Sequence, residues 1–164
     1  MQRLAALTYA MAGPGQPQAG FAALDTALGQ LVGHRLFTVV AWDAPNAVNR
    51  RVHSSRPADY PVGGAKSVGK ESDYHRRIIE AGEPRFYRDT DEIRVAFADH
   101  ALILSLGCEA CVNMPIRWDG RTVGAFNLLD AAGRYDPGML PLLRVAAALA
   151  VAPLLAVLNT QWRA

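Results

Sequence analysis

Hydrophobic positions in the first third of the chain predict one helix followed by two strands. An apolar stripe at helical spacing predicts a helix over about Gln18–Val32. Its members are Phe21, Leu24, Leu28 and Leu31. Leu36–Asp43 is rich in β-branched and aromatic residues and predicts a buried strand, and Asn49–Ser54 predicts an antiparallel return.

The middle of the chain predicts an irregular region with short helices. Ser55–Lys70 contains two prolines and three glycines, which is typical of a long loop. A short helix is expected over Asp73–Ala81, and residues 84–88 predict a short extended segment. Asp89 is placed to cap a second short helix and Asp99 a third. This region therefore predicts a covering layer rather than part of a regular sheet.

The last third shows the clearest pattern. Cys111–Trp118 alternates, with Val112, Met114, Ile116 and Trp118 on one face and Cys111, Asn113, Pro115 and Arg117 on the other. Asp119-Gly120 favours a two-residue hairpin turn, and Thr122–Leu129 predicts the returning strand. A final helix is expected from Asp136-Pro137 to about Asn159, with a bend near Pro153.

The order of these elements predicts an α+β fold. An antiparallel sheet would carry the first and last helices together on one face and an irregular helical cap on the other. We expect one domain over residues 18–160, preceded by an extension over residues 1–17. A sheet covered by irregular segments leaves a concavity, which is a common setting for a ligand.

The closing segment resembles that of GAF domains, a family related in fold to PAS domains. The resemblance rests on Met114-Pro115-Ile116, Asp119-Gly120, the run Val123-Gly124-Ala125-Phe126-Asn127-Leu128, and Tyr135-Asp136. Gly124 within a strand also indicates a helix packed closely on the sheet. The resemblance implies a GAF/PAS-like antiparallel sheet and a sensory or metabolite-sensing role in signal transduction.

Two known ligand classes of the family are not indicated. Cyclic-nucleotide-binding members carry an Asn-Lys…Phe…Asp-Glu signature, and Asp91-Glu92 here lacks the rest of it. Phytochrome-type members attach a bilin through a cysteine beside a characteristic histidine, and Cys108 and Cys111 do not lie in that setting. The cofactor therefore stays unknown. Family members are usually joined to an output domain, so we expect a separate signalling protein as partner.

Basic and aromatic residues in the middle of the chain suggest a ligand-binding region. Residues 50–88 contain nine Lys or Arg against five Asp or Glu, with aromatic residues between them. Such a combination suits a planar or anionic small molecule, although an ordinary solvated surface would show the same counts. The candidate ligand-binding residues are Arg51, His53, Tyr74, His75, Phe86 and Asn113.

Cys108 and Cys111 are the candidate redox residues. They form a C-x-x-C sequence, but a strand rather than a helix is expected to follow, so the thiols should be inert. The alternative comes from the family resemblance, because free methionine-R-sulfoxide reductases use cysteines just before this strand. Here Cys111 stands where their pattern has a glutamate. A third alternative is a dimerisation scaffold without a ligand, so whether the chain is an enzyme stays open.

Composition narrows the remaining possibilities. The balance of 17 basic and 15 acidic residues, a net charge of +2, does not suggest nucleic-acid binding. Scattered histidines suggest no metal site, and two cysteines are compatible with a reducing cytoplasm. The apolar stretch Met139–Leu158 contains Arg144 and two prolines, which favours a packing helix over a membrane span. Because one sheet face cannot cover all of its apolar residues, we expect a homodimer through the terminal helices.

Overall fold

A six-stranded antiparallel sheet forms the centre of the computed structural model, which describes residues 2–161 and the side chains of residues 5–160. Its strand order is β3-β2-β1-β6-β5-β4. The strands are β1 Leu36–Asp43, β2 Val48–Ser54, β3 Ala65–Ser67, β4 Arg85–Tyr87, β5 Ala110–Trp118 and β6 Arg121–Asp130. The three long strands predicted from the sequence are all paired inside this sheet, which confirms the α+β fold.

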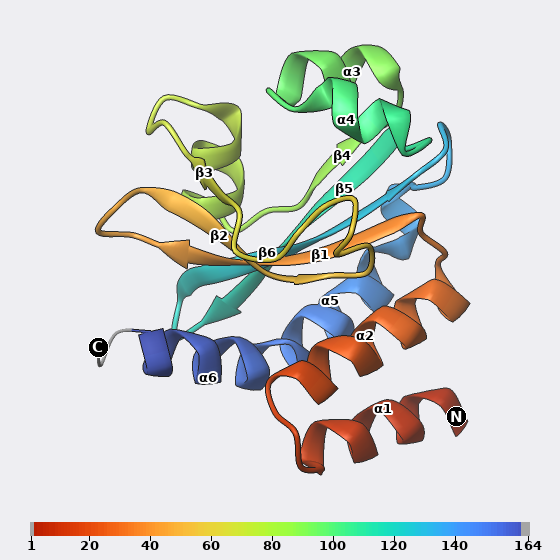
Figure 1. Ribbon diagram of the computed structural model, residues 1–164, viewed down its shortest axis with the longest axis vertical. Helices are drawn as coiled ribbons and strands as arrows, with labels where there is room; N and C mark the ends of the chain where they lie inside the picture. The colour runs from red at the N-terminus through yellow and green to blue at the C-terminus, as the bar shows by residue number, and fades with distance from the viewer. Residues whose placement is uncertain (1, 162–164) are drawn as a thin grey trace.

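Helices from the two ends of the chain cover one face of the sheet (Figure 1). They are α1 Gln2–Ala12, α2 Gln18–Leu31, η2 Pro137–Met139, α5 Leu140–Leu149 and α6 Val151–Gln161. The main hydrophobic core lies between these helices and the sheet, with Phe21, Phe37, Phe126 and Leu154 almost fully buried. Helix α1 lies outside α2, and its Leu7 joins this core.

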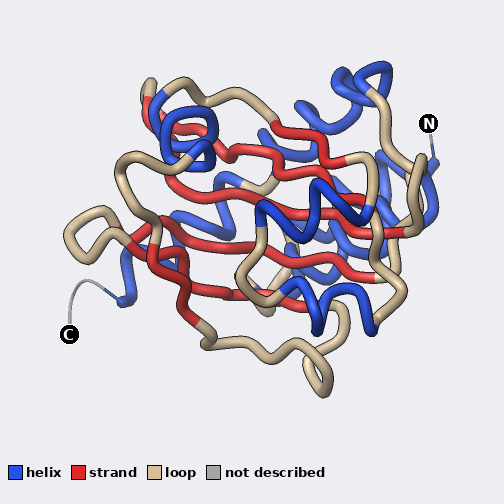
Figure 2. Tube along the Cα trace, turned by 90° about the horizontal axis from the view of Figure 1, so that it is seen from above, coloured by secondary structure: helices blue, strands red, loops and turns tan. Residues whose placement is uncertain are grey.

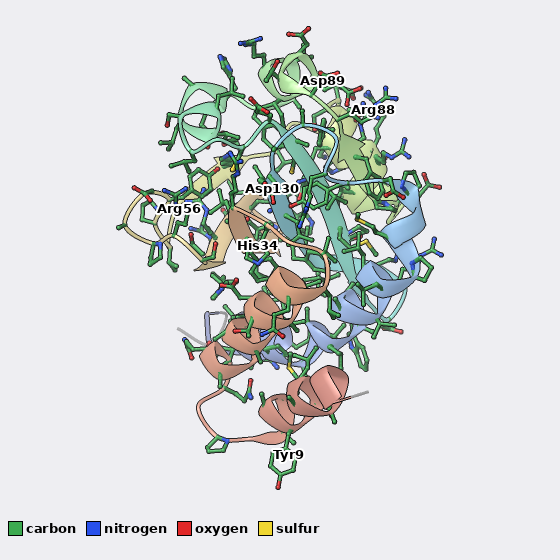
Figure 3. All side chains as sticks on the ribbon, turned by 90° about the vertical axis from the view of Figure 1, so that its right-hand side faces the viewer. Tyr9, His34, Arg56, Arg88, Asp89 and Asp130 are labelled. Carbon is green, nitrogen blue, oxygen red and sulfur yellow. The ribbon has the colours of Figure 1, made fainter. Side chains whose placement is uncertain are left out.

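Short helices and long loops cross the opposite face of the sheet (Figure 2). The elements are η1 His75–Glu80, α3 Thr90–Ala96 and α4 His100–Ser105. A smaller core lies under this cap, and it includes Tyr60, Tyr87, Ile93, Ile103 and Leu129. Tyr9 on α1 projects from the end of the molecule opposite Arg88 and Asp89 on the cap (Figure 3). The two layers therefore differ: regular helices pack on one face, and irregular segments cover the other.

Local signals account for the element boundaries. Asp119 and Gly120 both have positive φ, at 49° and 71°, as the predicted tight hairpin requires. The side chain of Asp89 caps α3, as predicted, by accepting from the backbone N–H groups of residues 91 and 92. The final helix divides at Ala150 rather than at Pro153. Proline at position 153 removes the hydrogen bond to the carbonyl four residues earlier, which is why the break lies upstream.

The helical segment Pro137–Thr160 is long and apolar enough to cross a membrane by length and composition. In the structure Leu143, Ala147 and Leu154 are buried in the main core. Val145 is 47% exposed on the outer side, so apolar surface remains on this layer. The sequence-based expectations of a homodimer and of no membrane contact stay predictions.

A half-buried charge cluster ties α2 to the sheet. Asp25 on α2 accepts hydrogen bonds from Nε2 of His34 and Nε2 of His53, each at 3.1 Å. His34 lies where the end of α2 meets the sheet (Figure 3). Burial opposes ionisation of both Asp25 and His34, but their mutual bonds dominate: the pKa of Asp25 is lowered and that of His34 is raised. The cluster therefore favours the charged forms of both groups.

This cluster predicts pH-dependent stability. A raised histidine pKa stabilises the fold below about pH 6.5, and the contribution disappears as the pH rises through the folded-state value. The lowered pKa of Asp25 contributes above about pH 3.8 and is lost as the pH falls through its folded-state value. Asp25→Asn should therefore lower the unfolding free energy by about 1–3 kcal/mol near pH 5–6, and by less at pH 8.5.

Urea denaturation of Asp25→Asn across this pH range measures the effect. Asp59→Asn is the matched control, because Asp59 forms an exposed ion pair with Arg56 and its loss should cost under about 1 kcal/mol at every pH. A deficit in Asp25→Asn that stays constant from pH 5 to pH 8.5 would contradict the coupling to His34.

Candidate functional site

A cavity of about 1130 Å³ lies between the sheet and the cap. Residues of β1, β2, β5 and β6 form its floor, and the covering segments form its walls and roof. We call residues 55–68 the roof loop. Backbone hydrogen bonds between Arg51 and both Gly63 and Gly64 fasten this loop to β2. The cavity is in the place where the sequence predicts a concavity.

The floor of the cavity is unusually polar for the surface of a buried sheet. Thr38, Asn49, Asn113 and Asn127 all contribute to it. Asn113 donates to Oδ1 of Asn127 at 2.6 Å, and Asn127 donates to the hydroxyl of Thr38 at 2.9 Å. The side-chain oxygens of Asn49 and Asn113 are buried without a hydrogen-bond partner. Buried polar atoms are normally paired, so these two oxygens are acceptors that a ligand could satisfy.

Aromatic side chains form the walls. Tyr60, Tyr74, Tyr87 and Phe97 line the cavity, and the rings of Tyr87 and Phe97 meet edge to face with centroids 5.1 Å apart. Burial raises the pKa of Tyr87 to about 12, and it also raises the pKa values of Tyr60 and Tyr74. The phenols are therefore neutral at physiological pH and can act as hydrogen-bond donors and stacking surfaces.

Arg51 brings a buried cation to the floor. Its side chain is 8% exposed, and its guanidinium carbon lies 3.5 Å from the centroid of the Tyr60 ring. Nη1 donates to the carbonyl of Pro61 at 2.6 Å, whereas Nε is buried without a partner. Within residues 2–161 no carboxylate forms an ion pair with it. Because a buried charge without a counter-charge is costly, Arg51 is the cavity group that most favours an anionic ligand.

Tyr60, Lys66 and Asp99 form a second polar cluster in the cavity wall. Asp99 accepts from the hydroxyl of Tyr60 and from Nζ of Lys66, both at 2.6 Å, and Lys66 also donates to the Tyr60 hydroxyl at 2.8 Å. Burial lowers the pKa of Lys66. Burial alone would raise the pKa of Asp99, but its bonds from Lys66 and Tyr60 leave it below the usual range. The cluster joins the roof loop to the start of α4.

Three of the six predicted ligand-binding residues line the cavity: Arg51, Tyr74 and Asn113. His53 does not, although an uninterrupted strand would place it on the same face as Arg51. The register of β1 and β2 shifts between Val39 and Val40, which leaves Val52 as an extra residue in β2. This β-bulge turns His53 to the helical face, where it bonds to Asp25.

Phe86 and His75 also lie outside the cavity lining. Phe86 pairs with Val112 and packs against the main core, so its neighbours Arg85 and Tyr87 face the cavity instead. His75 contacts the ring of Trp42, with centroids 6.0 Å apart. The face predicted for this strand is therefore off by one residue, since positions 85 and 87, and not 86, line the cavity.

Sequence reasoning also missed several cavity residues. Asn49 lies two positions before Arg51, so strand alternation places both side chains on the same face of β2. This periodic signal in the sequence is sufficient to predict Asn49 as a cavity residue. Lys66 and Asp99 gave no such signal, because they are 33 positions apart and meet only through the fold. Asp99 was predicted to cap α4, but its side chain makes no cap hydrogen bond and turns to Lys66 instead.

The two candidate redox cysteines are free and buried. Both belong to the smaller core beneath the cap, and Cys111 also lines the cavity. Burial raises the pKa of the Cys108 thiol to about 11, and it also raises that of Cys111. Because the thiolate is the nucleophile, protonated thiols of this kind do not favour redox chemistry. Among residues 2–161 no group of three or more His, Cys, Asp or Glu side chains is arranged to hold a metal ion.

Comparison with known proteins identifies the family. Residues 19–153 match the GAF domain model. No curated protein matches the sequence.

Solved GAF structures share the fold at low sequence identity. The GAF domain of a phosphoenolpyruvate-protein phosphotransferase from Acinetobacter superposes with a TM-score of 0.75 at 8% identity, covering 96% of this chain and 93% of that one. Its counterpart from Coxiella burnetii also gives 0.75, at 13% identity, with 99% and 96% covered. The GAF domain of a two-component sensor histidine kinase from Bacillus halodurans gives 0.66 at 16% identity, with 85% and 95% covered.

The sequence match and the fold agree with each other, and both agree with the resemblance seen in the closing hairpin. GAF domains generally serve sensing and signalling. The chain belongs to the GAF domain family.

Proposed function

We propose that this GAF domain is a non-enzymatic sensor that binds a small molecule in the cavity between sheet and cap. The observation that carries the proposal is Arg51, a nine-tenths buried cation that lines the cavity with no carboxylate partner in the described chain. A cation in such a place favours occupation by an anion. Burial raises the pKa of the Cys108 thiol, which does not favour thiol-dependent catalysis.

The charges around the cavity define the ligand more closely than the sequence counts do. Most of the basic surplus in residues 50–88 lies in surface ion pairs, including those of Arg50 with Asp43 and of Arg88 with Glu92. Four acidic residues line the cavity, and each has a basic partner. They are Asp73, Asp91, Glu92 and Asp99, paired with Arg85, Arg94, Arg88 and Lys66. Arg51 is therefore the cation that remains for a carboxylate or phosphate group of the ligand.

The rest of the lining suggests what the ligand body offers. The aromatic walls favour a flat or apolar group, and the free oxygens of Asn49 and Asn113 favour N–H or O–H donors. Binding would join the roof loop to the sheet, and a separate signalling protein would read the resulting change. The roof makes fewer apolar contacts than the helical face, so it is the part of the fold that a ligand would order most.

A thermal-shift screen of the purified protein against small acids and their neutral amides tests this function. An acid that binds should raise stability by about 2.7 kcal/mol at a concentration a hundredfold above its Kd. Native mass spectrometry of the same samples should show one bound molecule per chain. If no compound of either class binds, the sensory proposal fails. If neutral compounds bind and acids do not, the ligand-binding role stands and the anion preference is wrong.

A further inference from the structure

Asp99 makes an uncommon set of contacts for a residue that precedes a helix. The first-turn amides of α4 receive nothing from its side chain, which reaches instead to Lys66 and Tyr60 in the cavity wall. A cationic amine and a neutral phenol, both at 2.6 Å, are the donors that a protein would offer to the carboxylate of a ligand. Arg51, with its unpaired Nε, stacks on the same Tyr60 ring.

We propose that the Asp99 carboxylate is a built-in competitor that occupies the anion subsite of the empty cavity, and that an acidic ligand binds by displacing it from Lys66. This inference rests on the proposed sensory function and adds the mode of recognition and its consequence for the cap. The ligand class is a small molecule with a single carboxylate, because one carboxylate is what the subsite now holds.

The local charges favour exchange over simple addition. Arg51 and Lys66 bring two cations to the ring of Tyr60, and of these Lys66 pairs with Asp99 while Arg51 has no carboxylate partner among the described residues. A ligand carboxylate placed beside Arg51 would meet the like charge of Asp99, and two close carboxylates repel each other. If Asp99 moves out to solvent as the ligand enters, the number of ion pairs at the subsite is preserved. Its side chain is 28% exposed, so this path to solvent is short.

Exchange would also change how the cap is held. Asp99 immediately precedes α4, whereas Tyr60 lies in the roof loop and Lys66 in β3. Lys66 Nζ additionally lies 5.8 Å from the ring centroid of Phe97, at the end of α3. These contacts fasten the helical part of the cap to the roof loop. Releasing Asp99 would loosen α4 while the ligand takes over the contact to Lys66, so occupancy would be reported by the α3–α4 segment.

Asp99→Asn tests the sign of this effect. Removing the competing charge should tighten the binding of acids. If Asp99 instead helped to hold the ligand, the same substitution would weaken binding. The pair is partly exposed, so we expect a gain of roughly fivefold rather than more. The probes are benzoate, 3-phenylpropionate and indole-3-acetate with their amides, measured by isothermal titration calorimetry. Lys66→Gln should weaken acid binding, and Asp59→Asn, which removes an exposed carboxylate of the roof loop, should leave it unchanged.

Hydrogen exchange of the backbone amides supplies the second readout. In the wild type, acid binding should speed exchange in residues 100–106. Asp99→Asn should show the same faster exchange in these residues without ligand, while the amides of the sheet should exchange as slowly as in the wild type. Weaker or unchanged acid binding by Asp99→Asn overturns the inference, and so does equal binding of acids and amides. The outcome of the thermal-shift screen can be told apart from the outcome of this test. Neutral ligands found in the screen would support the sensory function and contradict only the proposed carboxylate exchange.

Discussion

Replacing Gly124 with alanine should strongly destabilise the domain, although it adds only one methyl group to the sheet. A Cβ at this position would lie 2.2 Å from the carbonyl oxygen of Val40 and 2.7 Å from Cδ2 of Leu154. The first contact is to the backbone of the neighbouring strand β1, which cannot rotate away. Overpacking usually costs 1–3 kcal/mol, and a backbone clash lies at or beyond the upper end. We expect a loss of about 3 kcal/mol or more, which lowers Tm by roughly 10 °C in a domain of this size.

Thermal unfolding followed by circular dichroism measures this loss, and Gly69→Ala is the control. A Cβ at Gly69 would meet nothing within 4 Å, and its φ is not positive, so its Tm should stay within a few degrees of the wild type. Adding Leu154→Ala to Gly124→Ala should not restore stability, because the contact with Val40 remains. A Gly124→Ala protein that melts within 2 °C of the wild type would show that β1 and α6 can each move away from β6 at little cost.

Gly124 also illustrates how much of the fold can be predicted from the sequence. A glycine inside a strand indicates close approach of another element, and the structure places Leu154 of α6 there. Likewise, the alternation in Cys111–Trp118 gives the two faces of β5 correctly: Val112, Met114 and Ile116 join the main core, while Cys111 and Asn113 face the cavity. These signals are local or periodic, which is why one sequence suffices to detect them.

The site is less predictable because its geometry depends on irregularities. The β-bulge that separates His53 from Arg51 leaves no reliable mark in the sequence, since Val52 fits a regular strand equally well. Tyr60, Lys66 and Asp99 meet only because the roof loop folds over the sheet and β3 pairs with β2. The surplus of basic residues over residues 50–88 does not define the site for a related reason. The count includes Arg50 and Arg88, which the fold places in surface ion pairs.

Arg51→Met should remove acid binding while leaving the empty protein about as stable as the wild type. Truncating one partner of a buried charge pair costs roughly 2–5 kcal/mol of binding, which corresponds to at least a thirtyfold weaker Kd for an acidic ligand. Without ligand, the exchange replaces a buried cation that has no carboxylate partner by an apolar chain of similar length. Replacing a buried charge by an apolar chain is often neutral or stabilising, although here it also removes the hydrogen bond to Pro61 and the stacking on Tyr60. We therefore expect the Tm of the empty protein to change by only a few degrees.

Arg50→Met is the matched control, because the adjacent arginine pairs with Asp43 and does not line the cavity. It carries the same change in net charge, so equal losses in both variants would indicate a general electrostatic effect. Arg51→Lys keeps the charge but loses the planar group that stacks on Tyr60, and intermediate affinity is expected. Titration of each variant with the same acid by calorimetry separates these outcomes. Wild-type affinity in Arg51→Met would mean that Lys66 alone anchors the anion, and the buried position of Arg51 would then need a structural explanation.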